Sequence, residues 1–274
     1  MKIIEPKVEL LSEIDITPES HIARCIRLCY GKKYKKPNQE IDKKIVKELI
    51  QKRNLSMLRH VNKYLDIEGC SPDFLAHITN SNYWNYNLLF DYASTNLQEF
   101  TESDIVKLEP ITFIENEQFL EECSKIPYLF ELYRLTFVIT TQISTAREFR
   151  ENQQIILDKE FQKYYTSKDG LLICKPWWYD GDSLAHDMYN ANIEYLETAY
   201  KYLIGTGMEP NDAKGILPLD TATKVIYTYS IREWEHILSL KLYGKDNSNW
   251  HIIMNMIKNQ INNFAKEHNI NYKV

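Results

Sequence analysis

The stretch that decides the fold runs from residue 213 to residue 241 and reads AKGILPLDTATKVIYTYSIREWEHILSLK. Arg232 and His236 lie four residues apart in it and share one face if this part is helical. Such a pair taken alone is usually structural. Here it belongs to a longer run without insertion or deletion, whose pattern positions are Ala213, Leu217, Pro218, Thr223, Thr228, Arg232, His236 and Leu240.

That spacing resembles one half of the active site of the flavin-dependent thymidylate synthases (the ThyX family), which reads approximately AR-x-x-LP-x-x-x-x-T-x-x-x-x-T-x-N-x-R-x-x-x-[HN]-F-x-x-LR. The resemblance implies that Arg232 and His236 lie at the flavin, and that the arginines of AR and LR reach the nucleotide. Those two positions hold Lys214 and Lys241, which keep the charge but lose the planar guanidinium fork. Ser230 replaces the family Asn among the cofactor-binding positions, which removes an amide that both donates and accepts.

The other half of the resemblance lies at residues 136–164, TFVITTQISTAREFRENQQIILDKEFQKY. The family reads approximately TF-x-(I/V)...ARQWFRHR-x-x-S-x-N-E-x-S-x-RY there. The positions that match without gaps are Thr136, Phe137, Ala146, Arg147 and Tyr164. The resemblance implies a cofactor contact for Arg147 and a nucleotide contact for Lys163, which replaces the Arg of RY. Phe161 stands in place of the family's second Ser.

The family's Arg-His-Arg triplet is missing from this chain, because its positions hold Glu151, Asn152 and Gln153. Sliding the alignment by one residue places Arg150 on the first Arg and still leaves the other two unmatched. Each lost charged hydrogen bond is worth ~1.5–3 kcal/mol, so losing two without compensation lowers FAD affinity more than about a hundredfold. The sequence therefore predicts altered cofactor contacts.

Two places are similar to the family's P-x-E-H segment, whose His approaches the flavin. His60 keeps an imidazole, with Arg59 in place of Glu, whereas residues 130–132 keep Glu131 and have Leu132 in place of His. We favour His60 as the cofactor contact and keep the second alignment open. Near the C-terminus, SNWHI aligns loosely with the family's AQ-x-EI and assigns Asn249 to the nucleotide.

Composition narrows the class of protein. A formal net charge of -5 at pH 7 and a pI near 5.9 argue against bulk binding of nucleic acid. Five scattered cysteines favour a reducing compartment over a disulfide framework, and Cys25 and Cys29 are best explained as core packing, so no metal site is predicted. There is no signal-peptide pattern and no apolar run near ~20 residues. We expect a cytoplasmic protein that does not enter a membrane.

The order of predicted elements is that of a mixed α/β fold. Periodicity, caps and β-branched runs predict a strand within residues 2–14, a helix opening at Thr17-Pro18, a helix over about 40–53, a strand over 133–140, a helix from Ser144, a helix from Pro210 and a last helix over about 248–266. A long helix is expected from Asp182 or Ser183 to Gly205 or Gly207, with apolar residues at helical spacing: Leu184, Met188, Ala191, Tyr195, Leu196, Ala199 and Leu203.

Residues 1–274 are expected to form one thymidylate synthase (FAD)-like domain, with an insertion at about 66–128 that adds a helix or two. The resemblance implies a flavoprotein methyltransferase of nucleotide biosynthesis, a homotetramer with FAD and dUMP between subunits. Such an enzyme uses methylenetetrahydrofolate as carbon donor and NADPH as reductant to methylate C5 of dUMP or a related pyrimidine nucleotide. The alternative is a non-catalytic homologue that keeps the fold and a nucleotide pocket. A different flavoenzyme on the same scaffold is a third possibility.

Overall fold

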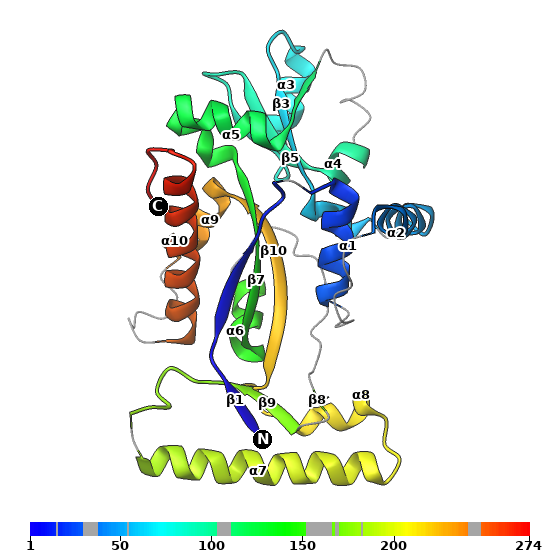
Figure 1. The fold of residues 1–274 in the computed structure, drawn as a ribbon, viewed down its shortest axis with the longest axis vertical. Coiled ribbons are helices and arrows are strands. Elements are labelled where there is room, and N and C mark those ends of the chain that lie inside the picture. The colour runs from blue at the N-terminus through cyan, green and yellow to red at the C-terminus, as the bar shows by residue number, and fades with distance from the viewer. Residues whose placement is uncertain are drawn as a thin grey trace.

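The computed structural model describes residues 1–14, 16–29, 38–53, 55–102, 111–151, 166–167, 170–181, 183–240 and 248–274. Its centre is an antiparallel sheet of β2 (Lys7–Leu11), β7 (Arg134–Gln142) and β10 (Ala222–Ser230), in the order β10-β7-β2. β7 is buried along its whole length because it is the middle strand and is covered on both faces. Figure 1 shows β7 and β10 running along the long axis of the molecule.

Successive side chains of β7 point to opposite faces of this sheet. Phe137 and Ile139 belong to the main core, which α9 (Ile231–Ser239) and α10 (Asn249–Glu267) cover. Val138 belongs to a second core under α1 (Pro18–Cys29), α2 (Gln39–Gln51) and the 3-10 helix η1 (Ser56–His60). In Figure 1, α9 and α10 therefore lie on the left of the sheet, and α1 and α2 on the right.

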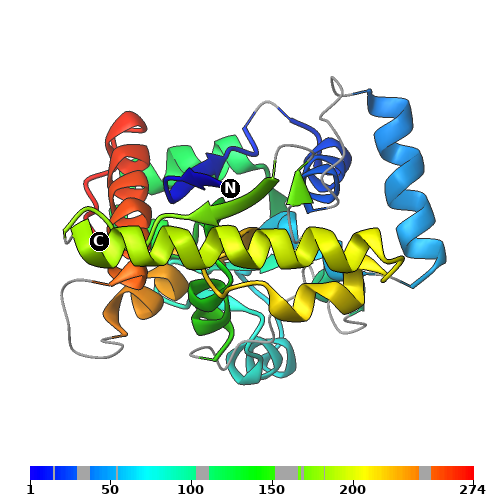
Figure 2. The same ribbon diagram turned by 90° about the horizontal axis from the view of Figure 1, so that it is seen from below.

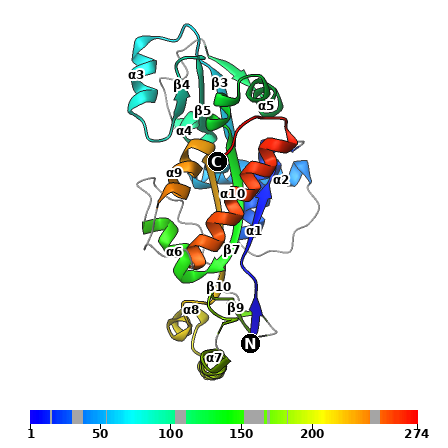
Figure 3. The ribbon, with the colours of Figure 1, turned by 90° about the vertical axis from the view of Figure 1, so that its left-hand side faces the viewer.

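A second sheet caps the upper end of the molecule. Its strands are β3 (Asn62–Asp66), β4 (Asn85–Asn87), β5 (Tyr92–Asn96) and β6 (Thr112–Ile114), in the order β4-β5-β3-β6. Around them lie α3 (Pro72–Asn80), α4 (Leu97–Glu102), α5 (Asn116–Lys125) and the 3-10 helix η3 (Pro127–Leu132). Figures 1 and 3 show this layer above the central strands.

The segment 66–128 thus contains the expected helices and also strands that the sequence pattern did not reveal. β4 and β5 read NYN and YASTN, and their Asn and Ser residues are depleted in strands, so the period-2 signal is weak. Phe119 and Phe130, from α5 and η3, are fully buried in the main core, to which Phe137 of β7 also belongs. Because this packing joins the segment to the central sheet, we propose that residues 1–274 form one domain with an insertion at about 66–128.

A third layer lies at the lower end. β1 (Lys2–Ile4) pairs in parallel with β9 (Gly170–Cys174), which also pairs with β8 (Thr166–Ser167). The long helix α7 (Ser183–Gly205) runs beneath them, followed by α8 (Pro210–Ala213) and the 3-10 helix η4 (Lys214–Ile216). Seen from below in Figure 2, α7 lies in front of the other drawn helices and strands.

The predicted helix starts are confirmed. The Ser20 N–H donates to Thr17 Oγ1 at 3.3 Å, and Pro18 is the first residue of α1. Ser248 caps α10 by accepting from the His251 N–H at 3.2 Å. The helix α6 (Ile143–Glu151) begins one residue before the expected Ser144. Of the two caps proposed for α7, Asp182 lies outside the described residues and Ser183 is the first helical residue.

Candidate functional site

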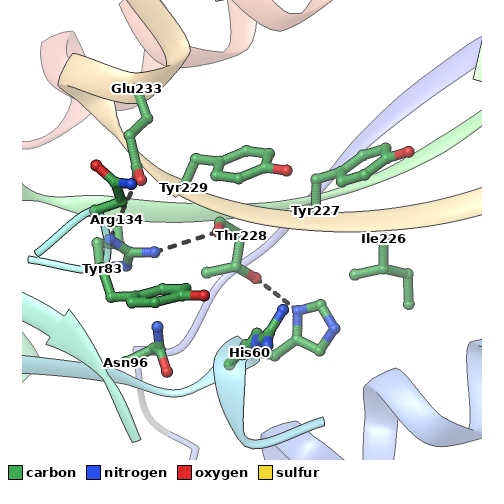
Figure 4. A pocket seen from close by; sticks show the side chains of 11 residues that line it. His60, Tyr83, Asn96, Arg134, Ile226, Tyr227, Thr228, Tyr229 and Glu233 are labelled. Carbon is green, nitrogen blue, oxygen red and sulfur yellow. Dashed lines mark hydrogen bonds and ion pairs between the residues drawn. The ribbon is translucent and has the colours of Figure 1, made fainter. Parts of the chain in front are cut away.

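A small cavity lies where β10 and β7 meet η1 and the second sheet (Figure 4). The cavity has a volume of about 40 Å³. The residues that line it are Arg59, His60, Asn82, Tyr83, Asn96, Arg134, Ile226, Tyr227, Thr228, Tyr229 and Glu233. A molecule of liquid water occupies ~30 Å³, and small-molecule sites have ~300–1,000 Å³. In one chain this cavity therefore has room for about one water and not for a nucleotide or a flavin.

One cationic residue in the wall of this cavity is Arg134, the first residue of β7. Its Nη1 lies 3.2 Å from Glu233 Oε2, and its Nη2 donates to the Thr228 carbonyl at 3.4 Å. The side chain of Arg134 is only 5% exposed. A buried arginine is stabilised by a partner of opposite charge, and Glu233 lies in position to be that partner.

Glu233 is held in place by the helix start of α9. Ser230 caps the helix, because its hydroxyl accepts from the Glu233 N–H at 3.1 Å while Glu233 Oε2 accepts from the Ser230 N–H at 2.6 Å. This reciprocal capping box satisfies two backbone donors at the helix start. Ser230 also pairs with Arg134 across the β10–β7 ladder, so strand register brings the cap and the arginine together.

A chain of polar side chains leads from this cavity into the protein. His60 Nδ1 lies 2.8 Å from Thr228 Oγ1, and that hydroxyl lies 2.7 Å from Thr136 Oγ1. Thr136 and Thr228 are opposite each other in the β10–β7 register, which explains the short hydroxyl contact. Thr136 in turn donates to Glu13 Oε1 at 3.5 Å. These contacts connect the imidazole of His60 with the carboxyl group of Glu13 through two hydroxyl groups.

Glu13 lies at a second cavity, of about 250 Å³, between α1, β3 and β6. Burial raises the pKa of Glu13 from 4.5 to about 7, against hydrogen bonds from Asn62 and Asn116 that favour the carboxylate. His21 Nε2 is 3.5 Å from Glu13 Oε1. Burial, together with the charges of His60 and Arg24, lowers the pKa of His21 from 6.5 to about 3. At neutral pH, therefore, His21 is neutral and Glu13 is divided between its two forms.

These two shifts predict opposite slopes of stability with pH. The Glu13 contribution is present below pH 4.5 and is lost as pH rises through about 7, because the unfolded carboxyl ionises first. The His21 contribution is present above pH 6.5 and is lost as pH falls toward about 3, because the unfolded imidazole protonates first. Between pH 4.5 and 6.5 each changes the free energy of unfolding by ~1.4 kcal/mol per pH unit, and they largely cancel.

Glu13→Gln removes one of the two slopes. In denaturant titrations between pH 5 and 6.5, its free energy of unfolding is expected to rise with pH by ~1.4 kcal/mol per unit relative to the unchanged protein. His21→Gln is the matched variant and gives a relative slope of the opposite sign. Stability curves for the three proteins that run parallel over this range would show that the two groups do not titrate as described.

The key arginine of the decisive stretch, Arg232, lies on α9 outside the small cavity. Its Nη2 pairs with Glu131 Oε1 at 2.5 Å and donates to the Tyr86 carbonyl at 3.0 Å. The side chain of Arg232 is 40% exposed. His236, one turn later, is exposed as well. Arg232 is therefore a partly exposed cation tied to a carboxylate, with His236 beside it on the same helix face.

The two candidates for the family's His segment both lie against the decisive stretch. His60 is buried and contacts Thr228, whereas Glu131 contacts Arg232. Leu132, which stands in the family His position of the second alignment, is fully buried in the main core. The geometry is compatible with either alignment.

The remaining predicted residues lie elsewhere. Lys214 is half-buried in η4, and Arg147 is exposed on α6. Asn249 begins α10, where its Oδ1 accepts from the Trp177 N–H at 2.8 Å. Lys163 and Lys241 fall outside the described residues, as do Asn152 and Gln153 of the missing triplet.

One chain therefore does not gather the predicted cofactor and nucleotide residues in one place. Lys214 precedes β10 and Arg232 follows it. β10 has nine residues, which at ~3.3 Å per residue separates its ends by about 26 Å. Figure 1 accordingly shows α8, just before Lys214, at the bottom of the molecule and α9 in its upper half, below α5.

Sequence reasoning missed the residues that build the polar interior. Glu13, His21, Arg134 and Glu233 were not singled out, and Thr136 and Thr228 were noted only as pattern positions. Arg134 carried a usable signal, because a charged residue in the run YRLTFVIT needs a buried counter-ion. The contact of Glu13 with Thr136 joins residues 123 positions apart, which no local pattern shows.

Comparison with known proteins shows the family to which this chain belongs. The family model of Thy1, the thymidylate synthase complementing protein, matches residues 91–265, which is more than half of the chain. The chain belongs to this family. The match includes the decisive stretch, β7 and residues 91–128 of the expected insertion.

One solved structure to which this chain is similar is that of a UMP/dUMP methylase, PolB from Streptomyces cacaoi, bound with 5-Br dUMP. It has 13% sequence identity and a TM-score of 0.42, with 97% of this chain and 93% of that chain covered. Comparison with curated proteins finds no match. The assignment to the family therefore rests on the family model.

No helix in the described part of the chain combines the length and the apolar character needed to span a membrane. Four described cysteines, Cys25, Cys70, Cys123 and Cys174, are free thiols. The side chain of Cys29 lies outside the described residues.

Proposed function

We propose that this protein is a flavin-dependent thymidylate synthase-like enzyme that methylates dUMP, or a related pyrimidine nucleotide, at C5. The carbon donor is methylenetetrahydrofolate and the reductant is NADPH. The observation that carries this proposal is the family match over residues 91–265, because it contains Arg232 and His236 at the motif spacing. The proposed location is the cytoplasm, because the five scattered cysteines favour a reducing compartment over a disulfide framework.

The residues proposed to hold FAD differ in how far they are exposed. Arg232 fits this role, since 40% of its side chain is exposed and a guanidinium stays charged and binds phosphate or a carbonyl with two N–H groups. His236 and Arg147 are exposed and available as further contacts. His60 and Ser230 are buried, and the Ser230 hydroxyl already caps α9, so we propose that these two position the site from behind.

When bound, a reduced flavin would supply the electrons that convert the transferred one-carbon unit into a methyl group. The chain's own part is to bind and orient, since no side chain of the motif is required as a covalent nucleophile. Arg232 orients the cofactor, while Lys214, Lys241, Lys163 and Asn249 are proposed to hold the nucleotide. Lysines supply charge for the phosphate but less orientation for the uracil ring.

The separation of these groups favours a site built between subunits. Within one chain the cavity beside His60 holds about 40 Å³, and Lys214 and Arg232 lie at opposite ends of β10. A homotetramer, with one subunit supplying Arg232 and another supplying Lys214 to each site, would bring the two sets of residues together. We therefore propose a homo-oligomer in which FAD and nucleotide lie at the contacts between chains.

A second candidate is a non-catalytic homologue that retains the fold and a nucleotide pocket. The observation that favours it is the replacement of the Arg-His-Arg triplet by Glu151, Asn152 and Gln153. This changes the local charge unfavourably for a bound dinucleotide. Arg232 is also engaged by Glu131, which a flavin would have to displace.

The two candidates are separated by product formation. The purified protein is incubated with FAD, NADPH, methylenetetrahydrofolate and either dUMP or UMP, and methylated nucleotide is measured by chromatography. Methylated product that depends on FAD supports the enzyme, and its loss in Arg232→Ala assigns it to this site. Absence of product with both nucleotides, from a protein that still binds dUMP, establishes the non-catalytic reading instead.

A further inference from the structure

The outer face of α7 carries a row of exposed apolar side chains. Leu184, Met188, Tyr195 and Tyr202 are 68%, 62%, 74% and 72% exposed. The opposite face is buried by Ile193 and Tyr200, and Ile193 packs with β9. Seen from below in Figure 2, the helix lies in front of the other drawn elements. The spacing that predicts the helix thus presents apolar groups to solvent.

This row, the α7 stripe, has the spacing by which helices pack against helices. It consists of Leu184, Met188, Ala191, Tyr195, Thr198 and Tyr202, which are separated by 4, 3, 4, 3 and 4 residues. Alternation of 3 and 4 is the a/d pattern of a coiled-coil seam. At 1.5 Å per residue the stripe is about 27 Å long, which is enough for a helix-to-helix interface.

We propose that the α7 stripe is a contact between two copies of this chain, in which the two helices pack antiparallel about a twofold axis near residue 193. This arrangement places Ala191 opposite the partner's Tyr195, Met188 opposite the partner's Thr198, and Leu184 opposite the partner's Tyr202. In two of these three layers a small residue faces a large one, as close packing requires. A twofold contact repeats every layer, so one stripe supplies both sides.

Charge on the flanks of the stripe favours the antiparallel direction. Asp187 and Lys201 lie on the same flank, one near each end of the stripe, and are 78% and 64% exposed. Antiparallel packing brings Asp187 of each chain to the partner's Lys201, which gives two ion pairs. Lys201 now holds Glu197 of its own helix and would exchange or share that partner. Parallel packing would set Asp187 beside the partner's Asn192 and align Tyr195 with its own copy.

One pair opposes the contact. Glu194, on the same flank at the centre, meets the partner's Glu194, and two like charges destabilise helix contacts by a small amount at exposed positions. Glu194 therefore marks the twofold axis and gives a position for a direct test. The contact supplies one interface of the homo-oligomer and rests on that part of the proposed function only.

Cysteine cross-linking tests the direction and the register. In the antiparallel contact the two copies of position 194 are offset by about 3 Å along the axis, whereas those of position 201 are offset by about 24 Å. Under mild oxidation Glu194→Cys is expected to form a disulfide-linked dimer, and Lys201→Cys is not. Cross-linking of Lys201→Cys as efficient as that of Glu194→Cys, or of neither beyond the unchanged protein, would overturn the proposal.

Sedimentation measures the strength of the contact in the full chain. Tyr195→Glu is expected to raise the dissociation constant of the oligomer at least tenfold, because Tyr195 occupies two central layers. Tyr128→Glu is the matched control, since Tyr128 is 72% exposed on η3, away from α7, and is expected to leave association unchanged. Circular dichroism checks that both variants are folded. Equal association of the two variants would remove the stripe from the interface.

Failure of this proposal can be told apart from failure of the proposed function, because neither readout uses flavin or nucleotide. A protein that binds no flavin but still cross-links through position 194 would support the proposed interface and contradict the proposed enzyme function. A protein that binds flavin and is active, but does not cross-link through position 194, would support the enzyme function and contradict the interface.

Discussion

Arg232→Ala is expected to lower the affinity for FAD by about 10- to 150-fold for each hydrogen bond that its guanidinium makes to the cofactor. A hydrogen bond to a charged group is worth ~1.5–3 kcal/mol, and 1.4 kcal/mol is a factor of ten in a dissociation constant. Because the Arg-His-Arg triplet that would provide further contacts to the cofactor is absent, the loss of FAD affinity is expected at the upper end of this range. Equilibrium titration of FAD, followed by flavin fluorescence or absorption, measures it.

Glu131→Gln is the matched variant for this experiment. In the structure Glu131 holds Arg232, so neutralising the carboxyl group leaves the arginine in place with a weaker competitor. FAD affinity is expected to stay the same or to increase. The interpretation of Arg232 as a flavin contact is wrong if Arg232→Ala binds FAD as the unchanged protein does.

Arg134→Met is expected to lower the free energy of unfolding by about 3–5 kcal/mol, the range seen when one partner of a buried ion pair is removed. Arg134 and Glu233 are 5% and 12% exposed, so solvent cannot replace the lost guanidinium. The Thr228 carbonyl loses its donor as well. Because whole domains are stable by ~5–15 kcal/mol, this loss is large. Guanidinium or urea unfolding, with the midpoint and slope both fitted, gives the value.

Arg134→Met combined with Glu233→Gln separates the unpaired charge from the lost packing. Gln can still complete the capping box at Ser230, so the double variant removes the stranded charge and keeps the helix start. The free energy of unfolding of the double variant is expected to regain most of what Arg134→Met alone loses. If the free energy of unfolding of Arg134→Met alone lies within ~0.5 kcal/mol of that of the unchanged protein, this ion pair contributes nothing measurable to stability.

Local patterns in the sequence predicted much of the fold. The helix starts at Thr17 and Ser248, the strand at 133–140 and the long helix before Gly205 depend on neighbouring residues, and each was found at or near its predicted place. β4, β5 and β6 were missed because they have only three to five residues each, and because β4 and β5 contain Asn and Ser residues that are depleted in strands. Their stability comes from the sheet rather than from their own composition.

The candidate site was predictable in one respect and hidden in another. The spacing of Arg232 and His236 placed them on one helix face, and α9 confirms this. The role of the α7 residues was not foreseen, since a row such as Met188 and Tyr195 usually faces a core, whereas here Ile193 and Tyr200 do. The periodicity of apolar residues shows how they are arranged around a helix, but it does not show which face of the helix packs against the rest of the domain.

The most direct test of the account is the visible absorption spectrum of the purified protein after incubation with FAD and desalting, recorded with and without dUMP. The account predicts that flavin is retained and that dUMP shifts its bands, because both ligands meet at the site that Arg232 defines. A colourless protein, or a retained flavin whose spectrum ignores dUMP at millimolar concentration, would contradict it.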